Sequence, residues 1–209
     1  MSTEYPKIKT LFVRDEATHK VHVGELRNPI YGLIKEWEWT EKIDGTNIRI
    51  IWDGAKITFG GRTESAQIPA KLLNWLNAQI HAEALYTTFG DTPAVVFGEG
   101  YGAGIQKGGN YSPEQRLIVF DVLVEGRWWL DRENTADVAG KLGLKIVPYW
   151  GTASLEDAVE AVRAGFASPL ALDTIGEEVY AEGLVGRTAQ PLFDKHGDRL
   201  IVKIKTRDF

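Results

Sequence analysis

The sequence has no cysteine among its 209 residues. Disulfide bonds, zinc sites built from thiolates and catalysis by a cysteine nucleophile are therefore excluded. No apolar run approaches the roughly 20 residues that a membrane-spanning helix needs. The first residues carry no apolar signal core, which favours a cytoplasmic protein without a membrane partner.

Common motifs of nucleotide and metal sites are also missing. The phosphate-loop pattern Gly-x-x-x-x-Gly-Lys-Ser/Thr does not occur, and the four histidines are too far apart for a metal-binding motif. Gly98–Ala103 loosely matches the dinucleotide-binding fingerprint, but further glycines follow it instead of a helix. Because that fingerprint requires a strand, a turn and a helix in succession, we reject it.

Positive charge is in deficit, since 24 Lys and Arg against 29 Asp and Glu give a net charge of −5. This balance disfavours a general nucleic-acid coat protein. The deficit is local, however: residues 156–182 hold seven carboxylates and one arginine, whereas residues 195–207 hold five Lys or Arg and one aspartate. The basic segment is compatible with local, modest-affinity binding of a nucleic-acid end.

Hydrophobic periodicity predicts an α+β fold in which antiparallel sheets, flanked by helices, form a cleft. Alternation and buried apolar runs predict strands over 35–42, 46–52, 55–59, 94–97, 117–124, 178–187 and 199–205. Helical spacing predicts one helix after Pro69, one that ends at Lys141 with Asn134 or Thr135 as its cap, and one that begins at Ser154. We expect Trp37, Trp39, Trp128 and Trp129 to lie in the core.

Two lysine motifs are candidates for chemistry. Lys42 lies in Lys42-Ile-Asp-Gly45 between two predicted strands, where a turn would expose it at the end of a sheet. In Lys203-Ile-Lys205, a period of 2 places both lysines on the face opposite Val202 and Ile204. Taken alone, each motif is more often non-functional: the first is usually a solvated turn lysine, and the second is usually an edge-strand pair that blocks sheet association.

Carboxylates and one aromatic residue complete the set. Glu99 comes soon after the buried run Ala94–Phe97, and Glu182 follows Val179-Tyr180-Ala181, so we expect both at strand ends. Phe120 lies in an apolar strand, where a core position is its simplest explanation. Asp121 in the same strand requires a polar partner or a wet cleft, because an unpaired buried carboxylate is costly.

Six of these motifs occur in the order typical of the covalent nucleotidyltransferase superfamily, which contains DNA ligases, RNA ligases and mRNA capping enzymes. They are Glu41-Lys-Ile-Asp-Gly-Thr-Asn47, Gly61-Arg62, Phe97-Gly-Glu99, Phe120-Asp-Val122, Glu182-Gly183 and Lys203-Ile-Lys205. With the glycine-rich stretch Gly100–Tyr111, the chain most resembles the ATP-dependent, phage-type RNA ligases.

The resemblance implies a phosphodiester-forming enzyme that works through lysyl-AMP. Lys42 would attack the α-phosphate of ATP, and the charges of Lys203 and Lys205 would favour its neutral amine and stabilise the phosphate. Glu182, with Glu99 as a second carboxylate, would place Mg²⁺ or Mn²⁺. The implied nucleotide-binding residues are Glu41, Asn47, Arg62, Glu99, Phe120 (on the adenine), Glu182, Lys203 and Lys205.

The implied substrate is RNA, whose 5′-phosphate end accepts AMP and is then joined to a 3′-hydroxyl with release of AMP. Asp44 is shared with DNA ligases, whereas similar RNA ligases often have histidine there, so a DNA ligase or DNA end-adenylating enzyme is the alternative. A non-catalytic module that binds nucleotides or nucleic-acid ends is a second alternative, which the presence of Lys42 disfavours.

The resemblance also implies a domain organisation. Residues 1–209 would form a single nucleotidyltransferase domain, with an ATP-grasp-like ligase adenylylation fold and a central nucleotide cleft. DNA ligases and capping enzymes continue into an OB-fold domain, but this chain ends four residues after Lys205, so we expect no such domain. We expect a monomer in a bacterium or phage-infected host cell, to which an accessory protein could add RNA affinity.

Overall fold

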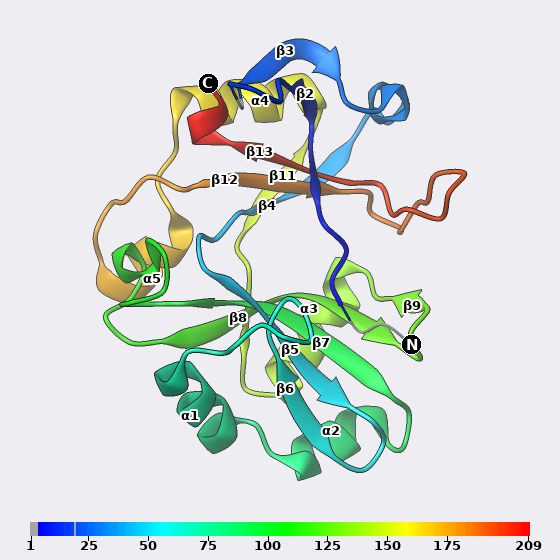
Figure 1. Cartoon of the computed structure of the whole chain (residues 1–209), viewed down its shortest axis with the longest axis vertical. Coiled ribbons are helices and arrows are strands. Elements are labelled where there is room, and N and C mark those ends of the chain that lie inside the picture. Colours follow the sequence, from blue (N-terminus) through cyan, green and yellow to red (C-terminus); the bar gives the residue numbers. More distant parts are fainter. Residues whose placement is uncertain (1–3, 19) are drawn as a thin grey trace. The chain divides into compact units, whose positions relative to one another are not determined.

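A computed structural model describes residues 4–18 and 20–209. The fold is mixed α+β, as predicted, and the chain divides into two compact units. The central unit contains the segment that ends at Pro6 together with Asp44–Val147, and the terminal unit contains Lys7–Ile43 and Pro148–Phe209. Most helices and strands of both are labelled in Figure 1, and each unit is described by itself.

The central unit is built on one sheet of largely antiparallel strands. Its order is β10-β8-β7-β5-β6, and β9 pairs with β8; only the edge pair β10–β8 is parallel. The strands are β5 (Thr46–Trp52), β6 (Ile57–Gly60), β7 (Ala94–Tyr101), β8 (Arg116–Val124), β9 (Trp128–Trp129) and β10 (Lys145–Ile146). The long antiparallel pairs β5–β7 and β7–β8 supply the framework of this unit.

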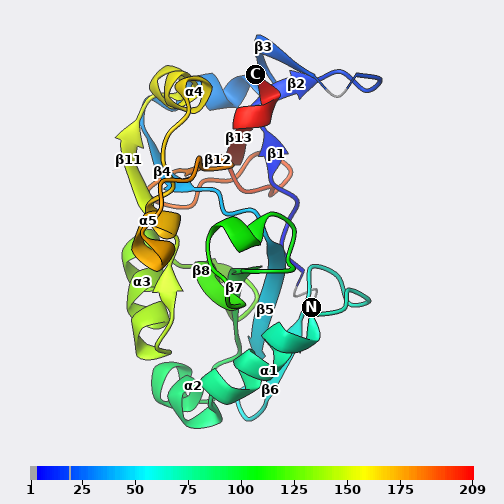
Figure 2. The same ribbon diagram turned by 90° about the vertical axis from the view of Figure 1, so that its left-hand side faces the viewer.

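Helices cover one face of this sheet (Figure 2). They are α1 (Ala70–Gln79), α2 (Ala82–Phe89) and α3 (Arg132–Lys141), and a 3₁₀ turn, η2, spans Gly108–Asn110. Strand alternation in β5 turns Ile48 and Ile50 toward Leu72 and Leu76 of α1, and all four side chains are fully buried. The β5 residues that alternate with Ile48 and Ile50 therefore lie on the opposite face of the sheet.

The terminal unit holds a sheet of order β1-β13-β12-β4-β11. Its strands are β1 (Lys9–Thr10), β4 (Trp37–Glu41), β11 (Tyr149–Ala153), β12 (Gly183–Arg187) and β13 (Ile201–Lys205), while β2 (Phe12–Arg14) and β3 (Val21–Leu26) form a separate ribbon. Helices α4 (Leu155–Ala164) and α5 (Pro169–Ile175) and the 3₁₀ turns η1 (Pro29–Leu33) and η3 (Thr206–Asp208) complete it. The pairs of β4, β12, β13 and β11 are antiparallel, and only β1 pairs in parallel.

Helix α4 packs across the terminal sheet (yellow in Figure 1), where its apolar residues meet Trp37 and Trp39. A capping box fixes its start: the Ser154 hydroxyl accepts from the Asp157 amide, and the Asp157 carboxylate accepts from the Ser154 amide. The predicted helix start at Ser154 and the core positions of Trp37 and Trp39, both fully buried, are confirmed.

Several local predictions need correction. The cap of α3 is Asp131, not Asn134 or Thr135, because its carboxylate accepts the Asn134 amide at 2.9 Å. The strand predicted over 178–187 begins only at Gly183. Trp128 is 58% exposed, since β9 lies at an edge of the sheet and Arg127 stacks on the indole 5.2 Å from the ring centroid.

Helices of the length and apolar character needed to cross a membrane do not occur within residues 4–18 and 20–209.

Candidate functional site

In the terminal unit, Lys42 directly follows β4 and its backbone amide donates to the Gly183 carbonyl at 2.9 Å. This bond ties the residue to the start of β12. The side chain is 19% exposed, so Lys42 is not the solvated turn lysine of the simplest interpretation. It is held at the end of the sheet, as the sequence predicted.

Glu182 connects two of the predicted lysines. Its Oε2 lies 2.5 Å from Nζ of Lys42, and its Oε1 lies 2.7 Å from Nζ of Lys205. All three side chains are less than one fifth exposed. One carboxylate thus bridges two ammonium groups, which come from the ends of β4 and β13.

The bridge controls the ionisation of Glu182. Burial alone would raise the pKa of this carboxyl, but the charges and hydrogen bonds of Lys42 and Lys205 outweigh burial and hold the pKa below its ordinary value. Glu182 is therefore a carboxylate at neutral pH. Two lysines brought together around one carboxylate in this way can bind the phosphate groups of a nucleotide.

Gly183 permits this arrangement. It pairs with Lys205 in the β12–β13 ladder and has a φ of 152°, a conformation that favours glycine. A Cβ on this residue would lie 2.0 Å from the Ile204 carbonyl oxygen. Only glycine therefore lets β12 start this close to β13 and place Glu182 beside Lys205.

Lys203 lies on the same side of β13 as Lys205. Val202 and Ile204, between and beside them, are buried in the core, whereas both lysines are half-buried. This confirms the alternation expected from the sequence. Lys203 stands opposite Val185 of β12 and Thr10 of β1.

Glu41, the neighbour of Lys42, is buried with 2% exposure. Its carboxylate accepts from the Ser168 hydroxyl at 2.5 Å and from the Leu170 amide at 3.3 Å, which ties β4 to the start of α5. Burial raises the pKa of Glu41, although these two hydrogen bonds oppose the shift. Within the terminal unit Glu41 thus holds the strand that leads into Lys42.

In the central unit, Asn47 of β5 stands directly opposite Glu99 of β7. The two side chains therefore share the sheet face opposite the helices. The Oδ1 atom of Asn47 is buried without a hydrogen-bond partner among the residues that the structure describes, so it is an acceptor that these residues leave unsatisfied. Glu99 lies inside β7 rather than at the strand end that the sequence predicted.

Phe120 is the extra residue of a β-bulge in β8. Phe97 pairs with Asp121 and Gly98 pairs with Val119, which leaves Phe120 without an opposite residue. The ring is half-buried and has an edge-on contact with Tyr5, at 5.0 Å between centroids. The bulge also turns Asp121 inward, where it accepts from the Tyr5 hydroxyl at 2.8 Å; this is the polar partner that the sequence required.

Arg62 is exposed in the loop that follows β6. The buried Arg49 of β5 holds this loop by donating to the Gly61 carbonyl at 2.7 Å. Arg49 was not among the predicted site residues, although an arginine among the isoleucines of a buried strand was a visible signal. Arg62, Asn47, Glu99 and Phe120 thus belong to the central unit, and Glu41, Lys42, Glu182, Lys203 and Lys205 to the terminal unit.

The RNA ligase family model matches residues 35–205 of this sequence, which is most of its length. The chain belongs to the RNA ligase family. The match includes every predicted site residue from Glu41 to Lys205, and it confirms the resemblance drawn from the six motifs.

Solved RNA ligases from Naegleria gruberi have a similar fold. A mutant with ATP and Mn aligns with a TM-score of 0.67 and 18% identity, covering 98% of this chain and 64% of that chain. A mutant with AMP and Mn aligns with a TM-score of 0.64 and 18% identity, covering 83% and 50%. The chain therefore spans less than two thirds of the length of these solved proteins, and at this identity the likeness establishes the fold.

Carboxylates are the side-chain groups that commonly bind a divalent metal such as Mg²⁺. In the described part of the chain, no group of three or more His, Cys, Asp or Glu side chains lies close enough to hold an ion. Mg²⁺ commonly binds through one or two carboxylates together with substrate phosphates. Glu182, an ionised and partly accessible carboxylate, fits that requirement as a single protein ligand.

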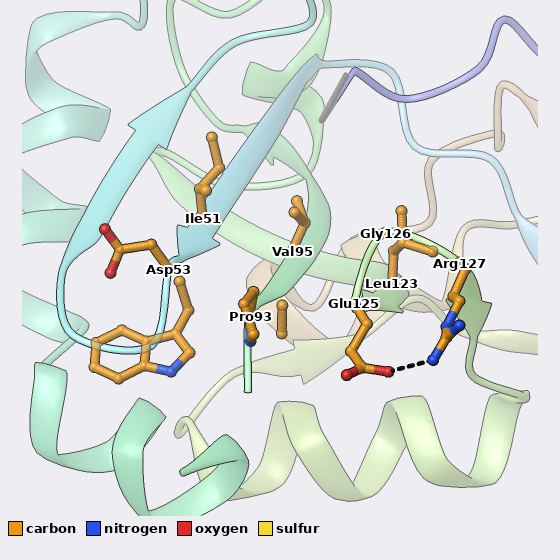
Figure 3. Close-up of a pocket in the computed structure, with 10 residues that line it drawn as sticks. Ile51, Asp53, Pro93, Val95, Leu123, Glu125, Gly126 and Arg127 are labelled. Carbon is orange, nitrogen blue, oxygen red and sulfur yellow. Dashed lines mark hydrogen bonds and ion pairs between the residues drawn. The ribbon is translucent and has the colours of Figure 1, made fainter. Parts of the chain in front are cut away.

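The central unit of this RNA ligase family member also has a cavity of about 490 Å³. Figure 3 shows its apolar lining by Ile51, Pro93 and Val95, and the Glu125–Arg127 ion pair at its rim. None of its lining residues belongs to the predicted site. It lies where β5 ends and β7 begins, whereas Asn47 and Glu99 lie toward the other end of the same strand pair.

Proposed function

We propose that the protein is an ATP-dependent RNA ligase that works through a covalent lysyl-AMP on Lys42. The observation that carries this proposal is the convergence of Lys42 and Lys205 on the Glu182 carboxylate. A nucleotide-transfer enzyme needs such a nucleophile beside a second cation that contacts the phosphate. Membership of the RNA ligase family and the similar fold of ATP- and AMP-bound ligases support the assignment.

Lys42 must lose its ion pair before it reacts. An ammonium has no free electron pair, so Lys42, which is 19% exposed, has to release its proton to solvent and leave the Glu182 carboxylate before it attacks. The nitrogen then forms a bond to the α-phosphorus of ATP, and the bond from that phosphorus to the bridging oxygen of the leaving pyrophosphate breaks. Lys205 and Lys203 stabilise the negative charge that grows on the α-phosphate oxygens.

Glu182 is the residue of the terminal unit that would hold the divalent metal, and the family pattern names Glu99 of the central unit as a further candidate carboxylate. Bound Mg²⁺ or Mn²⁺ supplies neutralisation of phosphate charge, which helps pyrophosphate to depart. The Naegleria gruberi structures with Mn support a divalent ion for this family. In this chain, Glu182 contributes a fixed negative charge that both lysines orient.

We assign the adenosine part of ATP to the residues of the central unit. Phe120, half-buried at its bulge, offers an aromatic face for adenine, and Asn47 offers an unpaired amide oxygen. Arg62 and Glu99 take the ribose side. Glu41 acts close to the nucleotide by holding β4 in place behind Lys42. Residues 1–209 then function as one nucleotidyltransferase domain of the phage-type group.

In the later steps AMP passes from Lys42 to the 5′-phosphate of an RNA end, and the 3′-hydroxyl of a second end displaces it. The phosphodiester bond forms and AMP leaves. Lys42 is then free to react with another ATP.

Covalent labelling tests the proposal. The protein is incubated with α-labelled ATP and Mg²⁺, denatured and examined for label. We expect label on the wild type and on Lys195→Ala, which removes an exposed lysine, and none on Lys42→Ala. An unlabelled wild type, or label that survives Lys42→Ala, contradicts the mechanism. Addition of 5′-phosphorylated RNA or nicked DNA then identifies the polymer, and faster sealing of DNA overturns the RNA assignment.

A further inference from the structure

Arg49 is a buried cation in an otherwise apolar strand. Its side chain is 1% exposed and lies on the face of β5 opposite Ile48 and Ile50. Guanidinium is protonated at all relevant pH values, so this position carries a permanent charge. A buried charge needs partners, and replacement by a packed apolar residue is often neutral or stabilising. Stability of the core alone therefore does not account for an arginine at this position.

The partners of Arg49 lie in the loop after β6. Its Nε donates to the Gly61 carbonyl at 2.7 Å, and its Nη1 lies 3.0 Å from Oε1 of Glu64. The Glu64 carboxylate is 78% exposed, so the buried bond to Gly61 is the better protected of the two. Arg62 lies between these two anchored residues, in a loop without regular secondary structure.

The fit around Arg49 is tight on the β6 side. A Cβ on Gly60 would lie 2.8 Å from Nη2 and 3.0 Å from Nε of Arg49. The Ala66 amide closes the loop by donating to the Thr63 carbonyl at 3.1 Å. Guanidinium has several donors in one rigid plane, whereas lysine has a single flexible ammonium. From this position in β5, only arginine can therefore contact both the Gly61 carbonyl and the Glu64 carboxylate with one planar group.

We propose that Arg49 is a positioning residue that orients Arg62 for ATP binding. It acts through the loop and does not itself contact the nucleotide. This inference rests on the proposed function, because Arg62 matters only if the protein binds ATP. Loss of the Arg49 head group frees the loop, and Arg62 then spends less time in its binding orientation, which weakens ATP binding without removing the nucleophile Lys42.

A double-mutant cycle tests the inference through the ATP concentration that half-saturates labelling of Lys42. We expect Arg62→Ala and Arg49→Lys each to raise it about tenfold, the range of one charge-assisted hydrogen bond. In the Arg62→Ala background, Arg49→Lys should add less than about twofold, because coupled residues are non-additive. The inference is overturned if the effects of the two substitutions on this ATP concentration multiply in the double variant. It is also overturned if Arg49→Lys alone leaves this concentration unchanged.

A second readout does not depend on activity. If Arg49 orders the loop, trypsin should cut after Arg62 faster in Arg49→Lys and in Gly60→Ala, which retains the arginine but displaces its head. Arg127→Lys is the matched control, since Arg127 is an exposed arginine of the same unit, and it should change neither readout. Thermal melting shows whether each variant is folded. If Arg49→Lys does not fold, Gly60→Ala provides the test of the loop in its place.

The outcomes separate the two proposals. An unlabelled wild type contradicts the proposed function, and the trypsin readout alone then decides whether Arg49 orders the loop. A labelled wild type whose ATP dependence is unchanged in Arg62→Ala leaves the function standing and overturns the role given to Arg49. Equal cleavage after Arg62 in wild type, Arg49→Lys and Gly60→Ala also overturns it.

Discussion

Lys42 and Glu182 are 140 residues apart in the chain, and Nζ of one lies 2.5 Å from Oε2 of the other. Adjacent strands produce this contact, because Lys42 follows β4, Glu182 precedes β12, and these strands pair antiparallel. Lys205 reaches the second oxygen of the same carboxylate from β13. Removal of the Glu182 charge should therefore disturb both lysines at once.

Glu182→Gln keeps the shape of the side chain and removes its charge. We expect labelling of Lys42 at saturating ATP to slow by about 10²-fold, the scale of a lost electrostatic contact at a reacting centre. The free energy of unfolding should fall by about 1–3 kcal/mol, because a hydrogen-bonded buried group loses its charge. Labelling kinetics and urea unfolding measure these effects. Glu178→Gln, at an exposed carboxylate of the same segment, is the control and should change neither.

The pH dependence of unfolding checks the same bridge. Burial raises the pKa of Glu182, but Lys42 and Lys205 lower it by more, so in the folded protein it lies below its ordinary value of 4.5. Its stabilising contribution is thus present above about pH 4.5 and is lost as pH falls through the folded pKa. The stability difference between wild type and Glu182→Gln should be constant near neutral pH and shrink in acid. A difference that grows in acid would contradict the assigned ionisation.

Glu41 should show the opposite sign. Burial raises its pKa above the ordinary value of 4.5, so the folded protein favours the protonated carboxyl. That contribution is fully present below about pH 4.5 and is lost as pH rises through the folded pKa. Unfolding measured from pH 4 to 7 should show wild type gaining stability over Glu41→Gln as pH falls. A flat difference would mean that burial does not govern this carboxyl.

Local patterns predicted much of the fold and the positions of the candidate lysines of β13. The alternation over Ile201–Lys205 fixes which residues face the core, and it placed Lys203 and Lys205 on one side of β13 correctly. Trp37 and Trp39 followed the same rule in β4. These predictions succeed because strand periodicity is set by neighbours in sequence.

Local sequence patterns could not predict which distant strands pair or where a strand is irregular. β12 lies between β4 and β13, and the bridge by Glu182 depends on that order, which no local signal encodes. The bulge at Phe120 depends on register between β7 and β8. Arg49 finds its partners only when β6 returns beside β5. The cap of α3 was misplaced because Asp131, Asn134 and Thr135 all suit a helix start.

Gly183→Ala should be strongly destabilising. The added Cβ would meet the Ile204 carbonyl oxygen at 2.0 Å, in a backbone conformation with φ of 152°. Strain and the forced shift of β12 should cost about 2–4 kcal/mol in urea unfolding. Gly140→Ala, in the last turn of α3 with open space around its Cβ, should instead stabilise by up to about 0.5 kcal/mol. Unchanged stability in Gly183→Ala would mean that β12 does not need its close approach to β13.

Phe120 should determine affinity for the adenine of ATP. Its bulged position leaves the ring half-buried, with an edge against Tyr5. Phe120→Leu removes the aromatic face and should raise the ATP concentration that half-saturates labelling about tenfold or more, as base stacking is worth ~1–3 kcal/mol. Phe120→Tyr keeps the ring and should stay within about twofold of wild type. Phe193→Leu, at a 49% exposed phenylalanine of the terminal unit, should bind ATP normally. Equal ATP dependence in Phe120→Leu and wild type would remove Phe120 from the nucleotide site.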